Sequence, residues 1–221
     1  MDTRATYDRI AAHFAQTREY PWPEVESFVA ETVTEETDRA LDLGCGNGRH
    51  AELLADHATE VVGLDVSRGL LGTASDRATE RGFAVDLVQG DASRLPLRDD
   101  TFDLAVYVAT LHHLRPREAR VASLDELARV LTPDGRGGRG GRALVSAWST
   151  AHDKFDAPPD TEVGFGTEVD WTLPGGETVP RFYHIYAPRE FEADLAESDC
   201  RIVSWEISSG NCYAVVGPGE D

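Results

Sequence analysis

A buried strand that runs directly into a glycine-rich turn constrains this chain more than any other feature. Residues 39–43 are followed by glycines at three alternate positions, Gly44, Gly46 and Gly48, and then by the helical stretch 51–55. Glycine lets the backbone turn tightly and lets a ligand approach the main chain. The N-terminus of the following helix adds free N–H groups and the positive end of a dipole. We therefore expect this turn to bind a ligand.

Two acids follow at the ends of the next predicted strands. Asp65 ends the next apolar run, roughly twenty residues beyond the turn, where a carboxylate can accept both hydroxyls of a bound ribose. The string 88–92 places Asp91 and Ala92 at the end of a further strand. The turn lacks the sixth-position glycine of the dinucleotide fingerprint, because Arg49 stands there. These signals predict a nucleoside site without a pyrophosphate cradle.

The order of the predicted elements favours an α/β fold. Helical patterns alternate with the first five strand candidates, which indicates a parallel sheet with right-handed crossovers. The last two strands are expected to form a closing antiparallel hairpin. We therefore predict a doubly wound, mostly parallel seven-stranded sheet in a single domain over residues 1–221. The strand candidates are 39–43, 61–65, 84–88, 103–108, 142–147, 201–207 and 212–216.

Segments outside the sheet indicate where a substrate enters. Apolar residues recur at helical spacing over about 3–18, and a second helix is expected over 24–34, so residues 1–35 are interpreted as a helical lid. Residues 150–186, after the fifth strand, are interpreted as a substrate-side insertion. Only 181–186 within this insertion reads as a strand, because the part before it has little periodicity.

The charge balance is strongly acidic. There are 40 acids against 21 bases, a net charge of −19, and Lys154 is the only lysine. Dispersed acids with so little lysine favour a halophilic protein of a high-salt cytoplasm; an ordinary acidic protein that avoids nucleic acid is the alternative. Near 1 M salt the Debye length is about 3 Å, so the net charge does not exclude an RNA substrate.

Three further observations place the chain in the cytoplasm. It has no run of 18 apolar residues that could cross a membrane, and its N-terminus lacks the apolar region of a signal peptide. Cys45, Cys200 and Cys212 form neither a zinc pattern nor a disulfide framework. We expect reduced thiols, no metal site and no membrane contact.

The glycine turn carries an acid two residues before its first glycine. This string, Asp42-x-Gly-x-Gly-x-Gly, resembles motif I of the class I methyltransferases that use S-adenosylmethionine. The resemblance implies that cofactor, with Asp65 on its ribose, Asp91 on the adenine amino group and the Ala92 N–H directed at the ring. The cofactor-binding residues implied in this way are Asp42, Gly44, Cys45, Gly46, Gly48, Asp65, Val66, Asp91, Ala92 and Val108.

Several segments together resemble one methyltransferase family. Residues 7–18 with Trp22-Pro23, then 95–103, 112–114 and 181–184, are similar to the tRNA methyltransferases that esterify 5-carboxymethyluridine at the wobble position. The Thr-Arg…Trp-Pro and Arg-Phe-Tyr-His segments are the specific parts, since all class I enzymes share the glycine motif. The resemblance implies tRNA as substrate. It also implies a heterodimer with a small zinc-binding activator protein that adds to the sheet edge and covers an apolar patch.

The chemistry of esterification agrees with these residues. A carboxylate is already an adequate nucleophile, so it needs aiming rather than a strong base. Arginine can hold one carboxylate oxygen or a neighbouring phosphate in a planar fork, and surface ion pairs are the alternative role. One of the adjacent histidines, His112 and His113, is expected to face the site. The predicted catalytic residues are Arg18, His112 and Arg181, and the predicted substrate-binding residues are Tyr183, His184 and Asn211.

The chain departs from the family in two places. Cys212 stands where the family has tryptophan after the asparagine, although Asn211 is kept. The Arg/Gly-rich segment 135–142 is extra, and a solvated loop expansion explains it more simply than RNA contact. Two other functions stay open: methyl transfer to a small molecule such as a quinone precursor, and an inactive cofactor-binding regulator. An alkali-stable product favours the first, and cofactor binding without turnover favours the second.

Overall fold

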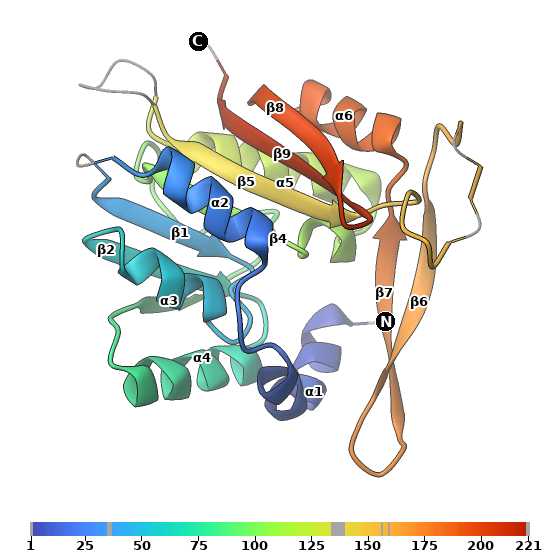
Figure 1. The fold of residues 1–221 in the computed structure, drawn as a ribbon, viewed down its shortest axis with the longest axis horizontal. Coiled ribbons are helices and arrows are strands. Elements are labelled where there is room, and N and C mark those ends of the chain that lie inside the picture. Colours follow the sequence, from blue (N-terminus) through green and yellow to red (C-terminus); the bar gives the residue numbers. More distant parts are fainter. Residues whose placement is uncertain (1, 35–36, 134–139, 156, 159, 220–221) are drawn as a thin grey trace.

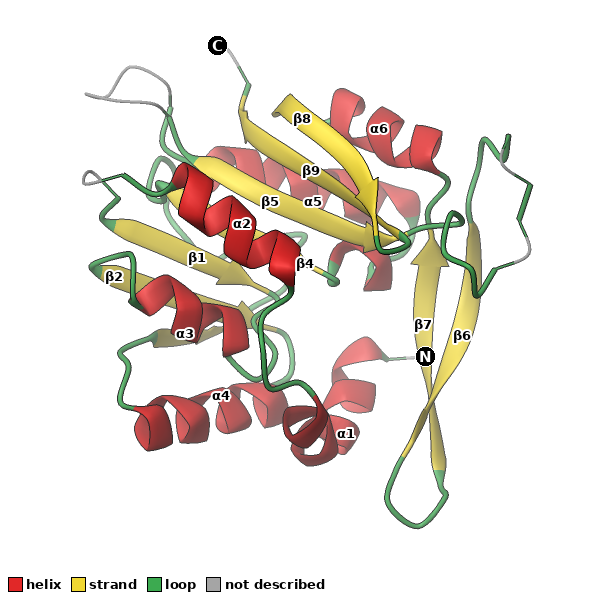
Figure 2. Cartoon of the chain, viewed as in Figure 1, coloured by secondary structure: helices red, strands yellow, loops and turns green. Residues whose placement is uncertain are grey.

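A seven-stranded β-sheet forms the centre of the computed structural model (Figures 1 and 2). The structure describes residues 2–34, 37–133, 140–155, 157–158 and 160–219. The strands of this sheet are β1 (Arg39–Leu43), β2 (Glu60–Asp65), β3 (Asp86–Gln89), β4 (Leu104–Val108), β5 (Arg142–Trp148), β8 (Cys200–Ser208) and β9 (Asn211–Pro218).

The strand order is β3-β2-β1-β4-β5-β9-β8. The first five strands are parallel, whereas β9 runs antiparallel to both β5 and β8. The order reverses between β1 and β4, which is the point where ligands bind in open α/β sheets. The predicted doubly wound, mostly parallel sheet with a closing hairpin is confirmed.

Helices cover both faces of the sheet (Figure 1). Successive side chains of a strand point to opposite faces. Leu41 of β1 therefore packs in one core cluster with Leu124 and Phe191, while its neighbour Ala40 packs in the other with Phe28 and Leu54. The helices are α1 (Thr3–Thr17), α2 (Pro23–Thr32), α3 (Arg49–Ala55), α4 (Arg68–Arg81), α5 (Arg117–Val130) and α6 (Pro188–Glu197), with a 3₁₀ turn η1 at Leu111–His113.

A second, two-stranded sheet stands beside the carboxyl ends of the main strands (Figure 1). β6 (Phe165–Thr172) pairs with β7 (Thr178–Ile185) in antiparallel register from end to end. The strand predicted over 181–186 belongs to β7. The prediction that no strand precedes it in this insertion was wrong, because β6 lies there. Of the β6 side chains only Trp171 is buried, so its apolar alternation is weak.

The first N-terminal helix packs against this second sheet, and the second does not. Tyr7 and Ile10 of α1 share a cluster with Trp171 and Val179, and Arg9 forms an ion pair with Glu177. α2 instead packs into the sheet core through three buried apolar side chains. Of the two helices, α1 therefore lies against the second sheet and α2 belongs to the helical layer of the main sheet, and the lid over residues 1–35 stays a prediction.

Two expectations concern segments away from the sheet. The Arg/Gly-rich segment 135–142 lies largely outside the described residues, and Arg142 opens β5. Among the helices that the structure describes, none combines the length and the apolar character needed to cross a membrane.

Candidate functional site

A cavity of about 730 Å³ opens at the carboxyl ends of the parallel strands. Its walls come from the turn after β1, the end of β2, the segment from Val108 to Arg115, and the inner face of β7. α1 and the loop at Trp22 close it from the N-terminal side. Its volume lies in the range of sites that enclose a small molecule.

The turn after β1 is so tight at Gly44 that there is no room for a side chain at this position. Gly44 has a φ of +75°, and a Cβ there would lie 2.1 Å from Oγ1 of Thr110. The Gly44 and Cys45 amides both donate to the Leu64 carbonyl, at 2.7 and 2.9 Å, which ties the turn to β2. Gly44, Cys45 and Gly46 line the cavity. Gly48 does not line it; with a φ of +76° it starts α3 against Ala74.

Asp42 shapes the turn from behind. Its carboxylate is 1% exposed and accepts the Ala51 amide of α3 at 2.9 Å. Burial raises its pKa to about 7. Asp42 is not among the residues that line the cavity. Its role as a direct cofactor contact is therefore corrected: the carboxylate satisfies an N–H in the first turn of a helix and so fixes where α3 begins.

Asp65 places a buried carboxylate in the cavity wall. Oδ2 accepts the Gly46 amide at 2.9 Å and Oδ1 accepts the Ser67 amide at 2.8 Å. Burial is the largest influence on this group and raises its pKa to about 6. Each carboxylate oxygen can accept more than one hydrogen bond, so both can still take a ribose hydroxyl.

The remaining predicted cofactor residues also lie in the wall of the cavity. Asp91 accepts hydrogen bonds from the amide and hydroxyl of Ser93 through Oδ1 alone, at 2.8 and 2.7 Å. Its second oxygen has no partner among the described residues. Val66, Ala92 and Val108 line the same region.

Five arginines line this cavity of an acidic protein, including Arg4, which pairs with Asp8, and Arg115, which lies over the Phe182 ring. The other three are Arg18, Arg49 and Arg181. Within the described part of the chain, no carboxylate oxygen lies within 4.0 Å of a nitrogen of these three side chains. The guanidinium groups of Arg18 and Arg181 lie 5.4 and 4.8 Å from the Trp171 ring centre. The surface ion pairs considered for Arg18 and Arg181 are therefore not formed.

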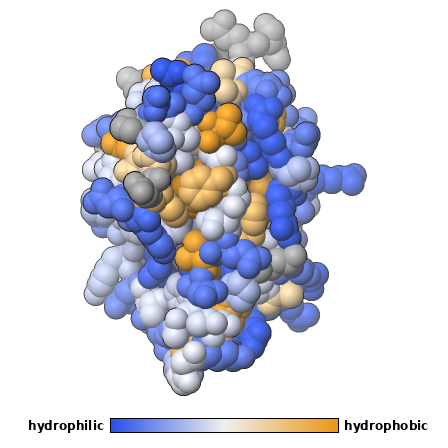
Figure 3. Space-filling view, turned by 90° about the vertical axis from the view of Figure 1, so that its right-hand side faces the viewer, coloured by the Kyte–Doolittle hydropathy of each residue, from blue (hydrophilic) through white to orange (hydrophobic). Residues whose placement is uncertain are grey.

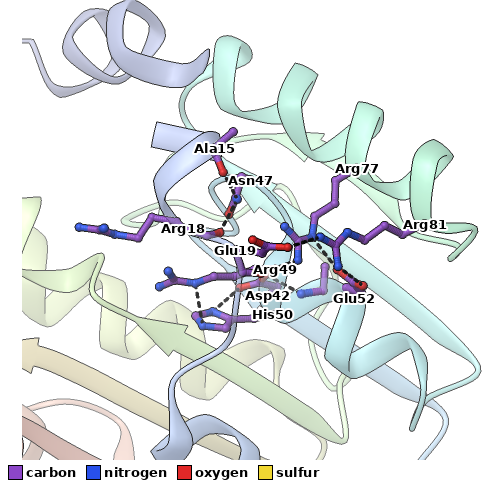
Figure 4. A network of polar contacts seen from close by, with 11 residues as sticks. Ala15, Arg18, Glu19, Asp42, Asn47, Arg49, His50, Glu52, Arg77 and Arg81 are labelled. Carbon is purple, nitrogen blue, oxygen red and sulfur yellow. Dashed lines mark hydrogen bonds and ion pairs between the residues drawn. The ribbon is translucent and has the colours of Figure 1, made fainter. Parts of the chain in front are cut away.

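Arg49 and Asn47 belong to the site but were missed by sequence reasoning. Arg49 is 8% exposed, and its guanidinium lies 5.4 Å from the Trp22 ring centre. Figure 4 shows its side chain extending from the glycine turn to the same side as that of Arg18. Asn47 donates to the Arg18 carbonyl at 2.7 Å and so holds the end of α1 against the turn. The signal in the sequence that could have identified both residues is their position in and directly after the glycine turn.

The two adjacent histidines have different surroundings. His113 bonds the Tyr7 hydroxyl through Nε2 at 2.8 Å and the Phe182 carbonyl through Nδ1 at 2.7 Å. It therefore joins α1 to β7, and burial lowers its pKa to about 4. His112 accepts the Trp148 amide on Nδ1 at 3.0 Å and has an unpaired Nε2. Of the two, His112 is thus the one with a buried ring nitrogen that lacks a partner in the described residues.

The predicted residues on β7 lie on two different faces of that strand, because successive side chains alternate in direction. Arg181 and Tyr183 share one face, and Arg181 donates to the Tyr183 hydroxyl at 2.6 Å. His184 points to the opposite face and bonds Glu190 of α6 at 2.8 Å, so it does not line the cavity. Its substrate role is corrected to a structural one. Asn211 lines the cavity at the start of β9.

Comparison with known proteins agrees with this geometry. Residues 41–137 match the model of a methyltransferase domain. A methyltransferase homologue of Encephalitozoon cuniculi is 30% identical over 95% of this chain and 92% of its own length. The chain belongs to the class I S-adenosylmethionine-dependent methyltransferases.

Other similarities are more partial. A tRNA (carboxymethyluridine(34)-5-O)-methyltransferase of Xenopus tropicalis is 34% identical over 65% of this chain, and the match spans 20% of that protein. The chain thus spans only a fifth of this larger relative. The methyltransferase solved in complex with the Trm112 activator of Haloferax volcanii superposes with a TM-score of 0.69, 15% identity and coverage of 100% and 99% of the two chains.

The cavity of this methyltransferase fits S-adenosylmethionine. Asp65 offers a buried acceptor for ribose hydroxyls, and the turn from Gly44 to Gly46 leaves the backbone open to the nucleoside. Asp91 and Ala92 lie where the adenine is expected. Arg49 supplies a cation next to the turn, which suits the carboxylate of the cofactor's amino-acid part. When bound, the cofactor supplies a methyl group on a positively charged sulfur.

The contact of Gly44 with Thr110 predicts a specific loss on substitution. In Gly44→Ala the new Cβ must displace the side chain of Thr110, and the backbone keeps an unfavourable φ. We expect a clearly lower melting temperature and at least about tenfold weaker cofactor binding by calorimetry, from a distortion of about 1.4 kcal/mol or more at the site. Gly72→Ala is the matched control, because a Cβ at this α4 position meets nothing within 4 Å. Equal behaviour of the two variants would contradict the role of the turn.

The raised pKa of Asp65, about 6, predicts a pH dependence of cofactor binding. The ionised carboxylate accepts the ribose hydroxyls, so binding is strongest when this group has lost its proton. Affinity should be level near pH 7 and fall by about tenfold per unit well below pH 6, as protonation removes the acceptor. Calorimetric titration between pH 5 and 7 measures this. Asp65→Asn should bind weakly with no such slope; a slope kept by the variant would assign it to another group.

Proposed function

We propose that this methyltransferase esterifies the carboxylate of 5-carboxymethyluridine at the wobble position of tRNA. The observation that carries the proposal is the group of Arg18, Arg49 and Arg181, which line the cavity without a carboxylate partner in the described residues. In a protein with a net charge of −19, a cavity that contains cations without a carboxylate partner suits an anionic ligand. The similarity to a tRNA carboxymethyluridine methyltransferase supports the identity of that anion.

The arrangement separates the two anions that this reaction brings together. Arg49 lies beside the glycine turn, on the cofactor side. Arg181 lies on β7, stacked on Trp171, on the side formed by elements outside the sheet. Arg18 reaches the cavity from the end of α1 and also stacks on Trp171. Arg181 is therefore assigned to the acceptor carboxylate and Arg18 to that carboxylate or a neighbouring phosphate.

The anticodon loop reaches the cavity past the second sheet. Polar side chains predominate on the face that carries β6, around a small apolar group (Figure 3). Phe165, at the start of β6, is 41% exposed and packs its ring 5.8 Å from that of Phe155. Single-stranded RNA is held by such aromatic side chains as well as by charge, which suits binding in high salt.

We also propose that an activator protein adds to an edge of the main sheet. The fold neighbour solved with the Trm112 activator supports this partner. The sheet ends at β3 and β8, and β8 exposes Val203, Trp205 and Ile207 by 49%, 37% and 45%. Open edge strands pair readily with another chain. Hydrogen exchange with and without a small zinc-binding activator of this kind should show protection of one edge strand; protection of neither would contradict the proposal.

Methyl transfer to tRNA tests the function directly. Labelled S-adenosylmethionine, total tRNA from the source organism and molar salt should give label on the wobble uridine. The label should be released by mild alkali, because an ester hydrolyses. Label that survives alkali, or label on a metabolite in place of tRNA, would reject carboxyl methylation of tRNA.

Arginine substitutions test the anion site. Arg18→Ala and Arg181→Ala should leave cofactor binding intact and reduce transfer by about 2–5 kcal/mol, the scale on which removing the partner of a buried charge acts. Arg189→Ala is the control, since that side chain is 72% exposed and pairs on the surface with exposed Glu162. Calorimetry for the cofactor and the alkali-labile label for transfer separate the two effects. Full activity of both cavity variants would refute the carboxylate clamp.

A further inference from the structure

Two buried nitrogens of residues that line the cavity have no acceptor in the described part of the chain. Nε2 of His112 and Nε of Arg181 are buried, and neither has a hydrogen-bond partner among the described residues. The His112 ring centre lies 4.7 Å from that of Tyr183, and the Arg181 guanidinium lies 5.1 Å from the same ring. Leaving a buried donor unpaired costs about 1–3 kcal/mol, so two such donors against one ring call for an explanation.

The backbone of β5 fixes which nitrogen of His112 carries the proton. The Trp148 amide can only donate, and it does so to Nδ1 of His112 at 3.0 Å. Nδ1 is therefore the acceptor of the ring, and a neutral ring must carry its proton on Nε2. No lone pair remains at the cavity to take up a proton.

The charged and titratable groups around His112 also favour the neutral ring. His113 adjoins it on the η1 turn, and Arg181 and His184 come from β7. Burial, followed by these three groups, holds the pKa of His112 well below its usual value. The ring therefore stays an uncharged donor across the physiological range.

We propose that Nε2–H of His112 and Nε–H of Arg181 form a two-donor cradle for the carboxylate of the methyl acceptor, so that His112 acts as a hydrogen-bond donor and not as a base. This inference rests on the proposed function and names the group that the acceptor must carry. Charge-assisted hydrogen bonds to an anion are the strong ones, and a planar carboxylate can accept from both donors.

Esterification balances without a base. A lone pair of the carboxylate oxygen forms the new C–O bond while the C–S bond breaks and leaves its electron pair on sulfur. The products are a neutral ester and a neutral thioether, and no proton moves. Because the acceptor loses its charge, the cradle binds the carboxylate more tightly than the ester. It therefore selects and aims the acceptor and weakens its hold on the product.

Conservative substitution separates a donor from a base. His112→Gln places an amide N–H near the position of Nε2, whereas His112→Ala removes the donor. We expect kcat/KM for 5-carboxymethyluridine tRNA within about fivefold of the unmodified protein in the first variant and at least about 100-fold lower in the second. The loss should lie mainly in KM, and neither kcat nor kcat/KM should show a titration assignable to His112 between pH 5.5 and 8. His57→Gln, at an exposed histidine, is the control. The donor role would be overturned if the two His112 variants were equally inactive. It would also be overturned if the dependence of kcat/KM on pH showed a titration that is lost in the His112 variants.

A measurement without turnover keeps this test apart from that of the proposed function. Nitrogen-15 NMR of the His112 ring should show a neutral imidazole protonated on Nε2 from pH 5.5 to 8, with or without tRNA. An anticodon stem–loop carrying 5-carboxymethyluridine should shift the Nε2–H signal, and the methyl-ester form should shift it less. A proton on Nδ1, or an imidazolium at pH 7, would overturn the cradle. If the wild-type protein methylated no tRNA while the His112 ring was protonated on Nε2, tRNA would be rejected as the substrate, and the assignment of His112 as a hydrogen-bond donor would stand.

Discussion

The close packing of Gly44 under Thr110 is the contact on which the rest of the site depends. Because no Cβ intervenes, the turn after β1 can lie against the end of β4 at the point where the strand order reverses. From this turn, the Gly46 amide fixes Asp65 and the Asn47 amide group holds the end of α1. Arg49 opens α3 directly after it. One backbone conformation thus sets an acid, the end of α1 and a cation around the same cavity.

The proposed acceptor side is built by elements that lie outside the main sheet, and His113 connects them. Its two ring nitrogens join Tyr7 of α1 to the Phe182 carbonyl of β7. The adjacent His112 belongs to the same 3₁₀ turn and is fixed by β5. A shift of α1 or β7 therefore moves the segment that carries the free donor.

The sequence predicted the sheet, and most of its predicted cofactor residues line one cavity, because both follow from strong local patterns. Buried strands and a glycine turn have few alternative structures. The failures have physical causes. β6 exposes most of its side chains, so its apolar alternation was too weak to see. Asp42 looks the same in sequence whether it faces a ligand or the Ala51 amide. The error on His184 was avoidable, since a strand that directs Tyr183 into the cavity must direct its neighbour away. In the sequence Arg49 only marks the position where the dinucleotide motif has glycine. Its position in the cavity wall depends on side-chain packing, which the sequence pattern does not show.

The distribution of charge gives these observations a common cause. At the high salt that the composition predicts, the acidic surface would act only over a few ångströms, so it would neither attract nor repel the proposed tRNA substrate at a distance. Recognition would then come from contacts made within the cavity, where screening is weakest. Arg18, Arg49 and Arg181 are stacked on Trp22 or Trp171, which keeps their charge in place without an ion pair. A carboxylate partner within the protein would have stabilised each arginine but cancelled its field. Aromatic stacking supports the cation and leaves its N–H groups for the ligand.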